Sequence, residues 1–202
     1  MNEYTHKNQN GTTVVVKVGD RVRIGPGVEI GDGVELETDV LVGPDSWLFS
    51  GVSVGVGTVI GSWTHLYAGV QVGRNCTIGS RTQMEEDVRV GNGCNIGNHV
   101  YLRRGVQLGE GVRIQSGSFL GLQVHTSFVA SLYIPGYWSI SMMPDVAQIA
   151  IGCEQHSVEF WRDVTDGQLQ NMALHGPEAW AKYGDLILAT YDAAREDLKA
   201  EG

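Results

Sequence analysis

The chain has 202 residues, of which 28 are glycine and 5 are proline, and only 18% of its residues are charged. So much glycine with so little proline, and without a three-residue period, excludes a collagen-like protein, so the glycines must have positional roles. The formal net charge of −9 repels polyphosphate backbones, and no run of lysine and arginine offsets it. We therefore expect no nucleic-acid partner.

The amino-terminal segment MNEYTHKNQNGTT is polar, and no run of about 18 apolar residues occurs anywhere in the chain. We therefore expect a cytoplasmic protein without a membrane partner. Cys76, Cys94 and Cys153 are an odd number of cysteines without a compact metal spacing. This pattern favours reduced thiols over a disulfide framework.

An apolar residue recurs at every sixth position from Val18 to Leu120, giving eighteen uninterrupted hexads. Glycine usually follows this residue, and the residue four positions after it is often small or branched. A helix of 3.6 residues per turn cannot keep a period of six on one face, whereas short strands separated by glycine turns can. The period predicts a solenoid of parallel strands whose coils stack at about 4.8 Å, with Cys76 and Cys94 as small core residues one coil apart.

This pattern resembles the hexapeptide-repeat family of left-handed β-helices, in which three hexads form one triangular coil. The left-handedness is implied by the resemblance alone, because the general rule for parallel crossovers gives the right-handed form. The predicted fold is an all-β solenoid, a left-handed parallel β-helix of 18 hexads and about six coils, with a C-terminal β/α cap. We expect a lead-in over 1–17, the β-helix over 18–121, a strand-rich closing segment over 122–151 and a helical segment over 152–202.

Two helices are predicted in the last segment. Ser157 is placed to cap a short helix, and Pro177 lies in the first turn of a final helix that ends near Ala200. Apolar residues of the final helix form a stripe that we expect to pack against the closing strands. This stripe consists of Trp180, Tyr183, Leu186, Ile187 and Tyr191.

The repeat is broken in an ordered way along one edge of the predicted prism. The glycine after the apolar residue is replaced at four positions eighteen residues apart, Phe49, Tyr67, Glu85 and Arg103. On the same edge, the acidic residues at 85–87 lie one coil before Arg103 and Arg104, so neighbouring coils can pair these charges. Because a solenoid core only has to be apolar, such breaks indicate a functional site.

One outward ladder of the prism is aromatic, whereas the other two faces are mostly polar. Contiguous exposed aromatic residues usually mark a protein interface or a ligand groove. The family resemblance implies a homotrimer with ligand clefts between neighbouring prisms at an edge of this kind. The ladder consists of Trp47, His65, Gln83, Tyr101 and Phe119, and the candidate ligand-binding residues are Trp47, His65, Tyr67, Glu85, Tyr101, Arg103 and Arg104.

The hypothesis that we favour from the sequence is non-enzymatic sequestration of a small anionic or nucleotide-like ligand, without a cofactor. Rings would stack on the aromatic side chains, and Arg103 or Arg104 would meet the anion. The segment IAIGCEQHSVEFW, from Ile149, resembles the tail of uncharacterised hexapeptide-repeat proteins from bacteriophage and mobile elements. That resemblance implies a phage-encoded protein in a bacterial or phage-infected host cell.

Two other hypotheses stay open. The family resemblance implies an acyltransferase that uses acetyl-CoA or another acyl-CoA, with a histidine near the cleft as general base. His65 is the best-placed histidine and His99 the second. A purely structural oligomer is the third hypothesis. We expect no metal site, because a zinc carbonic anhydrase of this fold needs a closely spaced histidine pair and the Cys153–His156 spacing lacks a second half-site.

Overall fold

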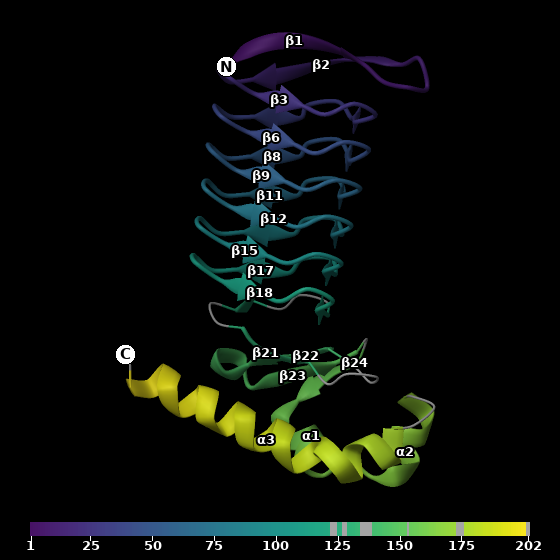
Figure 1. Cartoon of the computed structure of the whole chain (residues 1–202), viewed down its shortest axis with the longest axis vertical. Helices are drawn as coiled ribbons and strands as arrows, with labels where there is room; N and C mark the ends of the chain where they lie inside the picture. Colours follow the sequence, from purple (N-terminus) through teal and green to yellow (C-terminus); the bar gives the residue numbers. More distant parts are fainter. Residues whose placement is uncertain (122–124, 127–128, 134–138, 153, 173–175, 201–202) are drawn as a thin grey trace.

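The structure is a computed structural model that describes residues 1–121, 125–126, 129–133, 139–152, 154–172 and 176–200. Stacked coils form a long prism, and an antiparallel sheet and three helices follow at its C-terminal end (Figure 1). From residue 23 to residue 120, each hexad contributes one two-residue strand, and successive strands belong in turn to three different sheets. The predicted left-handed β-helix of about six coils with a C-terminal β/α cap is confirmed.

The first sheet contains eight strands, which pair in parallel except for the antiparallel pair β1 and β2. These are β1 (Asn2–Lys7), β2 (Thr13–Val18), β5 (Glu35–Leu36), β8 (Ser53–Val54), β11 (Gln71–Val72), β14 (Arg89–Val90), β17 (Gln107–Leu108) and β20 (His125–Thr126). The second sheet contains β3 (Arg23–Ile24), β6 (Leu41–Val42), β9 (Val59–Ile60), β12 (Thr77–Ile78), β15 (Asn95–Ile96) and β18 (Arg113–Ile114). The third, which we call the aromatic sheet, contains β4 (Glu29–Ile30), β7 (Trp47–Leu48), β10 (His65–Leu66), β13 (Gln83–Met84), β16 (Tyr101–Leu102) and β19 (Phe119–Leu120).

The glycine that follows most strands is required by the close stacking of the coils. A Cβ atom added to Gly43 would lie 2.6 Å from the backbone nitrogen of Ser62, in the next coil. Real Cβ atoms essentially never approach other atoms that closely, so a side chain here would push two coils apart. The repeat therefore encodes both the turn and the spacing of the coils.

The core of the prism contains a polar ladder among its aliphatic residues. The buried hydroxyl groups of Ser46, Thr64 and Thr82 each donate to a glycine carbonyl of the next coil, at 2.9 to 3.0 Å. Cys76 and Cys94 occupy equivalent inward positions, and their thiols donate to carbonyl oxygens at 3.1 Å. The neighbouring Cys76 thiol and burial raise the pKa of Cys94. Both cysteines are buried core residues, as predicted, and neither is exposed for chemistry.

The N-terminal segment covers the open end of the aromatic sheet. The side-chain amide of Asn8 donates to the carbonyl of Ile30 at 2.9 Å and accepts from its N–H at 2.8 Å. A ring nitrogen of His6 lies 2.9 Å from the carbonyl oxygen of Val28. These side chains satisfy backbone groups that would otherwise be left without a strand partner at the end of the solenoid.

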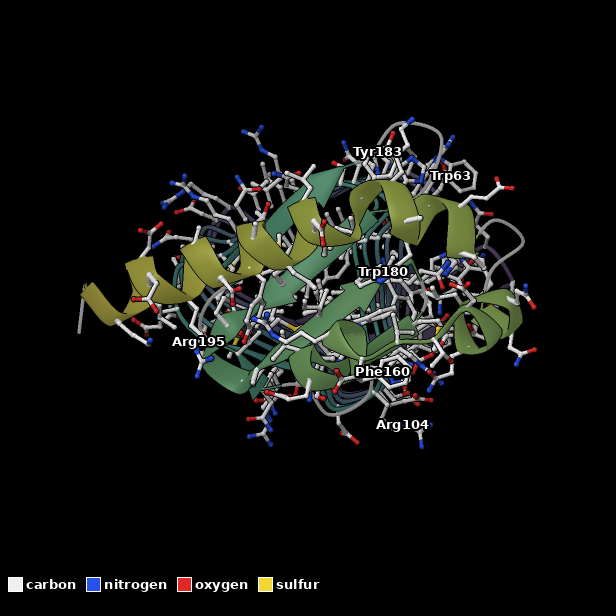
Figure 2. All side chains as sticks on the ribbon, turned by 90° about the horizontal axis from the view of Figure 1, so that it is seen from below. Trp63, Arg104, Phe160, Trp180, Tyr183 and Arg195 are labelled. Carbon is white, nitrogen blue, oxygen red and sulfur yellow. The ribbon has the colours of Figure 1, made fainter. Side chains whose placement is uncertain are left out.

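The C-terminal end carries a four-stranded antiparallel sheet in the order β21-β22-β23-β24. Its elements, with the short 3-10 helix η1 and the three α-helices, are β21 (Ala130–Tyr133), β22 (Ser139–Met143), η1 (Pro144–Val146), β23 (Gln148–Ile151), β24 (Glu154–Ser157), α1 (Val158–Arg162), α2 (Asp166–Met172) and α3 (Gly176–Ala200). A second apolar core that includes Ile149, Trp161, Ile187 and Tyr191 joins this sheet to the helices. The view from the C-terminal end shows α3 lying across the base of the prism (Figure 2).

Ser157 caps α1 as predicted, because its hydroxyl accepts from the N–H of Phe160 at 3.2 Å. The predicted stripe on the final helix is correct except for Leu186, which is 52% exposed. Adjacent helical residues are about 100° apart around the helix axis, so Ile187 faces the sheet and Leu186 faces away. No helix in the described part of the chain is long and apolar enough to cross a membrane.

Candidate functional site

The aromatic ladder forms as the eighteen-residue spacing predicts. Trp47, His65, Gln83, Tyr101 and Phe119 occupy directly paired positions on successive strands of the aromatic sheet. The rings of Trp47 and His65 are stacked at 5.4 Å between centroids, and those of Tyr101 and Phe119 at 5.6 Å. Strands that lie one coil apart therefore present their rings as columns along the prism.

A second column lies on the adjoining edge. The rings of Phe49 and Tyr67 are nearly parallel, with an interplanar angle of 4° and centroids 4.8 Å apart. Phe49 also lies 6.0 Å from Trp47, so the two columns meet near the N-terminal end of the prism. We did not include Phe49 among the candidate ligand-binding residues, although its break in the glycine pattern was the signal that could have identified it.

Glu85 is the centre of a polar network further along the same edge. One of its carboxylate oxygens accepts from the Tyr101 hydroxyl at 2.5 Å, and the other accepts from the Arg104 backbone N–H at 2.9 Å. The Arg103 guanidinium lies 3.8 Å from the second oxygen, and Arg104 pairs with Glu86 at 3.0 Å. The predicted pairing of charges between neighbouring coils is therefore present.

The network fixes the protonation of its members. Burial alone would raise the pKa of Glu85, but the hydrogen bonds from Tyr101 and Arg104 and the charge of Arg103 together hold it below its ordinary value. The hydrogen bond to Glu85, aided by burial, raises the pKa of Tyr101. At neutral pH a charged carboxylate therefore faces a protonated phenol, and both arginines are close to carboxylates of their own chain.

His65 is half-buried and stacked on Trp47, and neither of its ring nitrogens has a hydrogen-bond partner among the described residues. His99 lies in the turn between β15 and β16, with φ of 56° and an exposed side chain. That turn belongs to the same edge as Trp63, and Figure 2 shows Trp63 and Arg104 on separate sides of the prism. The structure therefore brings His65, but not His99, together with the other candidate residues.

His156, whose spacing from Cys153 was considered as a metal half-site, lies on β24. His156 stacks on Phe160 at 4.0 Å between ring centroids and lies 3.5 Å from a carboxylate oxygen of Glu154. Cys153 lies outside the described residues. Within the described ranges, no group of three or more His, Cys, Asp and Glu side chains is placed to hold a metal ion.

The chain is thus a parallel β-helix of hexapeptide repeats with ring columns and a histidine on one face. The family profile described as "Bacterial transferase hexapeptide (six repeats)" matches residues 87–121. A second profile, described as "Hexapeptide repeat of succinyl-transferase", matches residues 15–44 and 51–80. Both profiles match within the solenoid, so the repeats of this chain are similar to the hexapeptide repeats of transferases.

Several solved structures are similar to parts of this chain. The acetyltransferase domain of PglB from Neisseria gonorrhoeae is 22% identical over 57% of this chain and 54% of its own length, with a TM-score of 0.40. AntD, an N-acyltransferase from Bacillus cereus, is 12% identical over 59% of this chain and 79% of its own, with a TM-score of 0.48. A hexapeptide transferase family protein from Anaplasma phagocytophilum is 17% identical over 89% and 93%, with a TM-score of 0.43. The chain spans about half the length of the PglB domain structure, and no curated protein matches it.

The profile matches correct the function that we favoured from the sequence. Both matching profiles describe transferase repeats, and they support the acyltransferase alternative over non-enzymatic sequestration of an anionic or nucleotide-like ligand. The polar network also argues against capture of an anion. The guanidinium groups of Arg103 and Arg104 already have the carboxylates of Glu85 and Glu86 as partners. None of the comparisons supports the resemblance of the segment from Ile149 to phage proteins.

Proposed function

We propose that the protein is an acyl-CoA-dependent O- or N-acyltransferase in which His65 is the general base. The observation that carries the proposal is the position of His65 in a transferase-type hexapeptide solenoid. Histidine is the residue type that most often serves as a general base, and His65 is the one histidine of the described aromatic ladder. Its ring nitrogens have no partner among the described residues, so either nitrogen can accept a proton from a substrate.

The chemistry needs one proton acceptor and one attacking group. As the acceptor's hydroxyl or amine attacks the thioester carbonyl, His65 takes the proton that this group loses. The new bond between the acyl carbon and oxygen or nitrogen replaces the carbon–sulfur bond of the thioester. The imidazolium then returns the proton to the departing coenzyme A sulfur, which restores neutral His65. Stacking on Trp47 fixes the plane of the imidazole during both transfers.

The proposal includes assembly of the chain as a homotrimer. Trp47 is 47% exposed in the single chain, and the ladder is the aromatic face of a prism whose other faces are mostly polar. A neighbouring copy would cover this face and enclose His65 in a cleft between subunits, from which water is more easily excluded. In that cleft, Tyr67, Glu85, Tyr101 and the two arginines would contact the acyl donor or the acceptor.

The test is an acyl-transfer assay on the purified protein. It would use acetyl-CoA with panels of amine and hydroxyl acceptors, and mass spectrometry would detect the acylated product. We expect His65→Ala and His65→Asn to lower turnover by about 100-fold or more, since general-base catalysis typically contributes 10²- to 10⁴-fold. His99→Ala is the matched control and should retain activity. Undiminished transfer by His65→Ala would exclude His65 as the base, and absence of turnover with all acceptors would favour a structural oligomer.

A further inference from the structure

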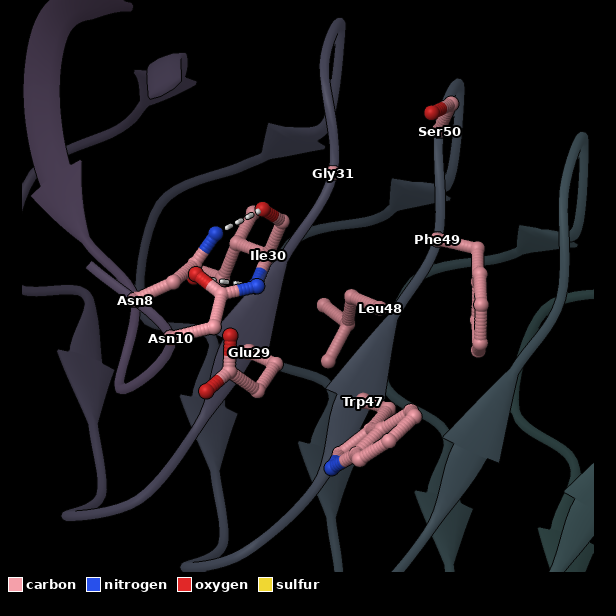
Figure 3. A pocket seen from close by; sticks show the side chains of 9 residues that line it. All are labelled: Asn8, Asn10, Glu29, Ile30, Gly31, Trp47, Leu48, Phe49 and Ser50. Carbon is pink, nitrogen blue, oxygen red and sulfur yellow. Dashed lines mark hydrogen bonds between the residues drawn. The ribbon is translucent and has the colours of Figure 1, made fainter. Parts of the chain in front are cut away.

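A pocket of about 290 Å³ lies at the N-terminal end of the two ring columns (Figure 3). It is bounded by the loop after β1, the strands β4 and β7, and the turn that follows β7. Its lining residues are Asn8, Asn10, Glu29, Ile30, Gly31, Trp47, Leu48, Phe49 and Ser50. The pocket is separate from the network around Glu85, and Trp47 is the one lining residue that also has a role in the acyl-transfer chemistry above.

Both columns end at this pocket. Trp47 stacks on His65 towards the C-terminal end, and the residue paired with Trp47 on its other side is Glu29, which is not aromatic. Phe49 stacks on Tyr67, and the equivalent residue one coil earlier is Gly31, which has no side chain. Two aromatic rings therefore lie beside the pocket without an aromatic partner on that side.

The absence of a side chain at Gly31 has a structural cause. A Cβ atom at this position would lie 2.6 Å from the backbone nitrogen of Ser50 in the next coil. The backbone as it lies at this turn therefore requires glycine, although the equivalent turn of the next coil holds Phe49. Because Gly31 has no side chain, the space next to the Phe49 ring does not depend on the rotamer of a flexible side chain.

The polar lining carries one negative charge. The Asn8 amide is occupied by its hydrogen bonds to Ile30. One oxygen of the Glu29 carboxylate accepts from the Gln9 backbone N–H at 2.8 Å, which holds the group beside the pocket. Figure 3 shows Glu29 and Asn10 on the side of the pocket opposite Phe49. No lysine, arginine or histidine is among the lining residues.

We propose that this pocket binds the positively charged ammonium group of a small ligand. Aromatic ring faces attract cations, and the attraction strengthens when the cation is partly desolvated. The Glu29 carboxylate adds an ionic partner, and the net charge of −9 favours the approach of a cation. An anionic group would meet only repulsion here. A neutral group of the same shape would gain the apolar contacts but would leave the carboxylate without a counter-charge.

The pocket lies close to the proposed active site along the aromatic sheet. Glu29, Trp47 and His65 lie on three successive strands, so Glu29 and His65 are about two strand spacings, or roughly 9.6 Å, apart along the sheet. If His65 is the base, as proposed above, the bound ammonium group is part of the acceptor and holds the reacting atom beside His65. Cation binding itself does not require catalysis, so the two proposals can fail independently.

The experiment compares choline with 3,3-dimethylbutan-1-ol, a neutral molecule of nearly the same shape, by isothermal titration calorimetry without acyl-CoA. We expect choline to bind at least tenfold more tightly than the alcohol. Glu29→Gln and Trp47→Leu should each weaken choline binding at least tenfold, and Trp47→Phe should weaken it less because one ring face remains. Glu110→Gln, an exposed carboxylate that does not line the pocket, is the matched control and should bind as the unaltered protein does.

The following results would support or overturn the proposal that the pocket binds an ammonium group. Equal affinity for choline and the alcohol, or no binding of either, would overturn the proposal, and so would full binding by a folded Glu29→Gln variant. Circular dichroism and thermal unfolding would show that each variant is folded. Choline binding is measured without acyl-CoA, so it does not depend on turnover. Choline binding with no transferase activity would therefore leave this inference standing while the proposed function failed.

Discussion

Replacement of Glu85 by glutamine tests whether the polar network stabilises the edge that carries the candidate site. The side chain is only 21% exposed and accepts from Tyr101 and from the Arg104 backbone through two different oxygens. Glutamine has one oxygen, so one of the two donors would face an NH₂ group and lose its partner. An unpaired donor costs about 1 to 3 kcal/mol. We expect Glu85→Gln to lower the free energy of unfolding by roughly this amount.

The effect should depend on pH in a defined direction. Because the pKa of Glu85 is held below its ordinary value, its contribution is fully present above the pKa of the unfolded carboxyl, about 4.3. The contribution is lost as the pH falls through the folded-state pKa. Glutamine does not titrate, so the stability difference between the two proteins should narrow in acid.

The measurement is urea unfolding at neutral and acidic pH, together with hydrogen exchange of the Arg104 amide, which reports the local bond directly. Glu86→Gln is the control, because Glu86 pairs with the exposed Arg104 side chain and such surface pairs contribute little to stability. Equal stability of Glu85→Gln and the unaltered protein at neutral pH would refute the reasoning. A stability difference that did not change with pH would refute the titration argument alone.

Two further predictions concern assembly and stacking. Gln83→Glu, in the middle of the aromatic ladder, should dissociate the proposed trimer in light scattering because it buries a charge without a partner, whereas Gln71→Glu on the first sheet should not. A stable monomer of the unaltered protein would contradict that assembly. Gly43→Ala should lower stability by roughly 1 to 3 kcal/mol in thermal unfolding, because its Cβ would overlap the backbone of the next coil. Gly167→Ala, which meets only open space, should be tolerated, and equal loss at both glycines would contradict the stacking argument.

The repeat made most of the fold predictable from the sequence. The uninterrupted apolar period from Val18 to Leu120 fits only a structure that returns an inward position every six residues. Three hexads per coil then place residues eighteen apart on neighbouring strands, so the pairing of Trp47 with His65 followed from counting. The same counting placed Arg104 beside Glu86. These predictions succeeded because each depends on local turns and a fixed spacing.

The parts outside the repeat were less predictable for a physical reason. The pocket depends on Asn8, whose side chain bonds to the backbone of Ile30 across 22 residues, and no periodic pattern encodes that contact. The helix α2 was not predicted, and Leu186 was placed on the wrong side of α3. The formation of α2 and the side of α3 that faces the sheet both depend on tertiary packing at the end of the solenoid. The apolar pattern of the sequence alone is compatible with more than one orientation of α3.

The strict spacing of the solenoid explains why one edge can hold both ring columns and a pocket. Residues that follow each other in a ladder are about 4.8 Å apart along the sheet, which is close to the distance at which aromatic rings stack. The observed centroid distances of 4.8 Å for Phe49 and Tyr67 and 5.4 Å for Trp47 and His65 agree with this spacing. A column built in this way leaves ring faces open only where an aromatic residue has a non-aromatic neighbour. Both columns stop on one side at Gln83 and Glu85 and on the other at Glu29 and Gly31, and the pocket lies at the second of these places, where Glu29 is two strand spacings from His65.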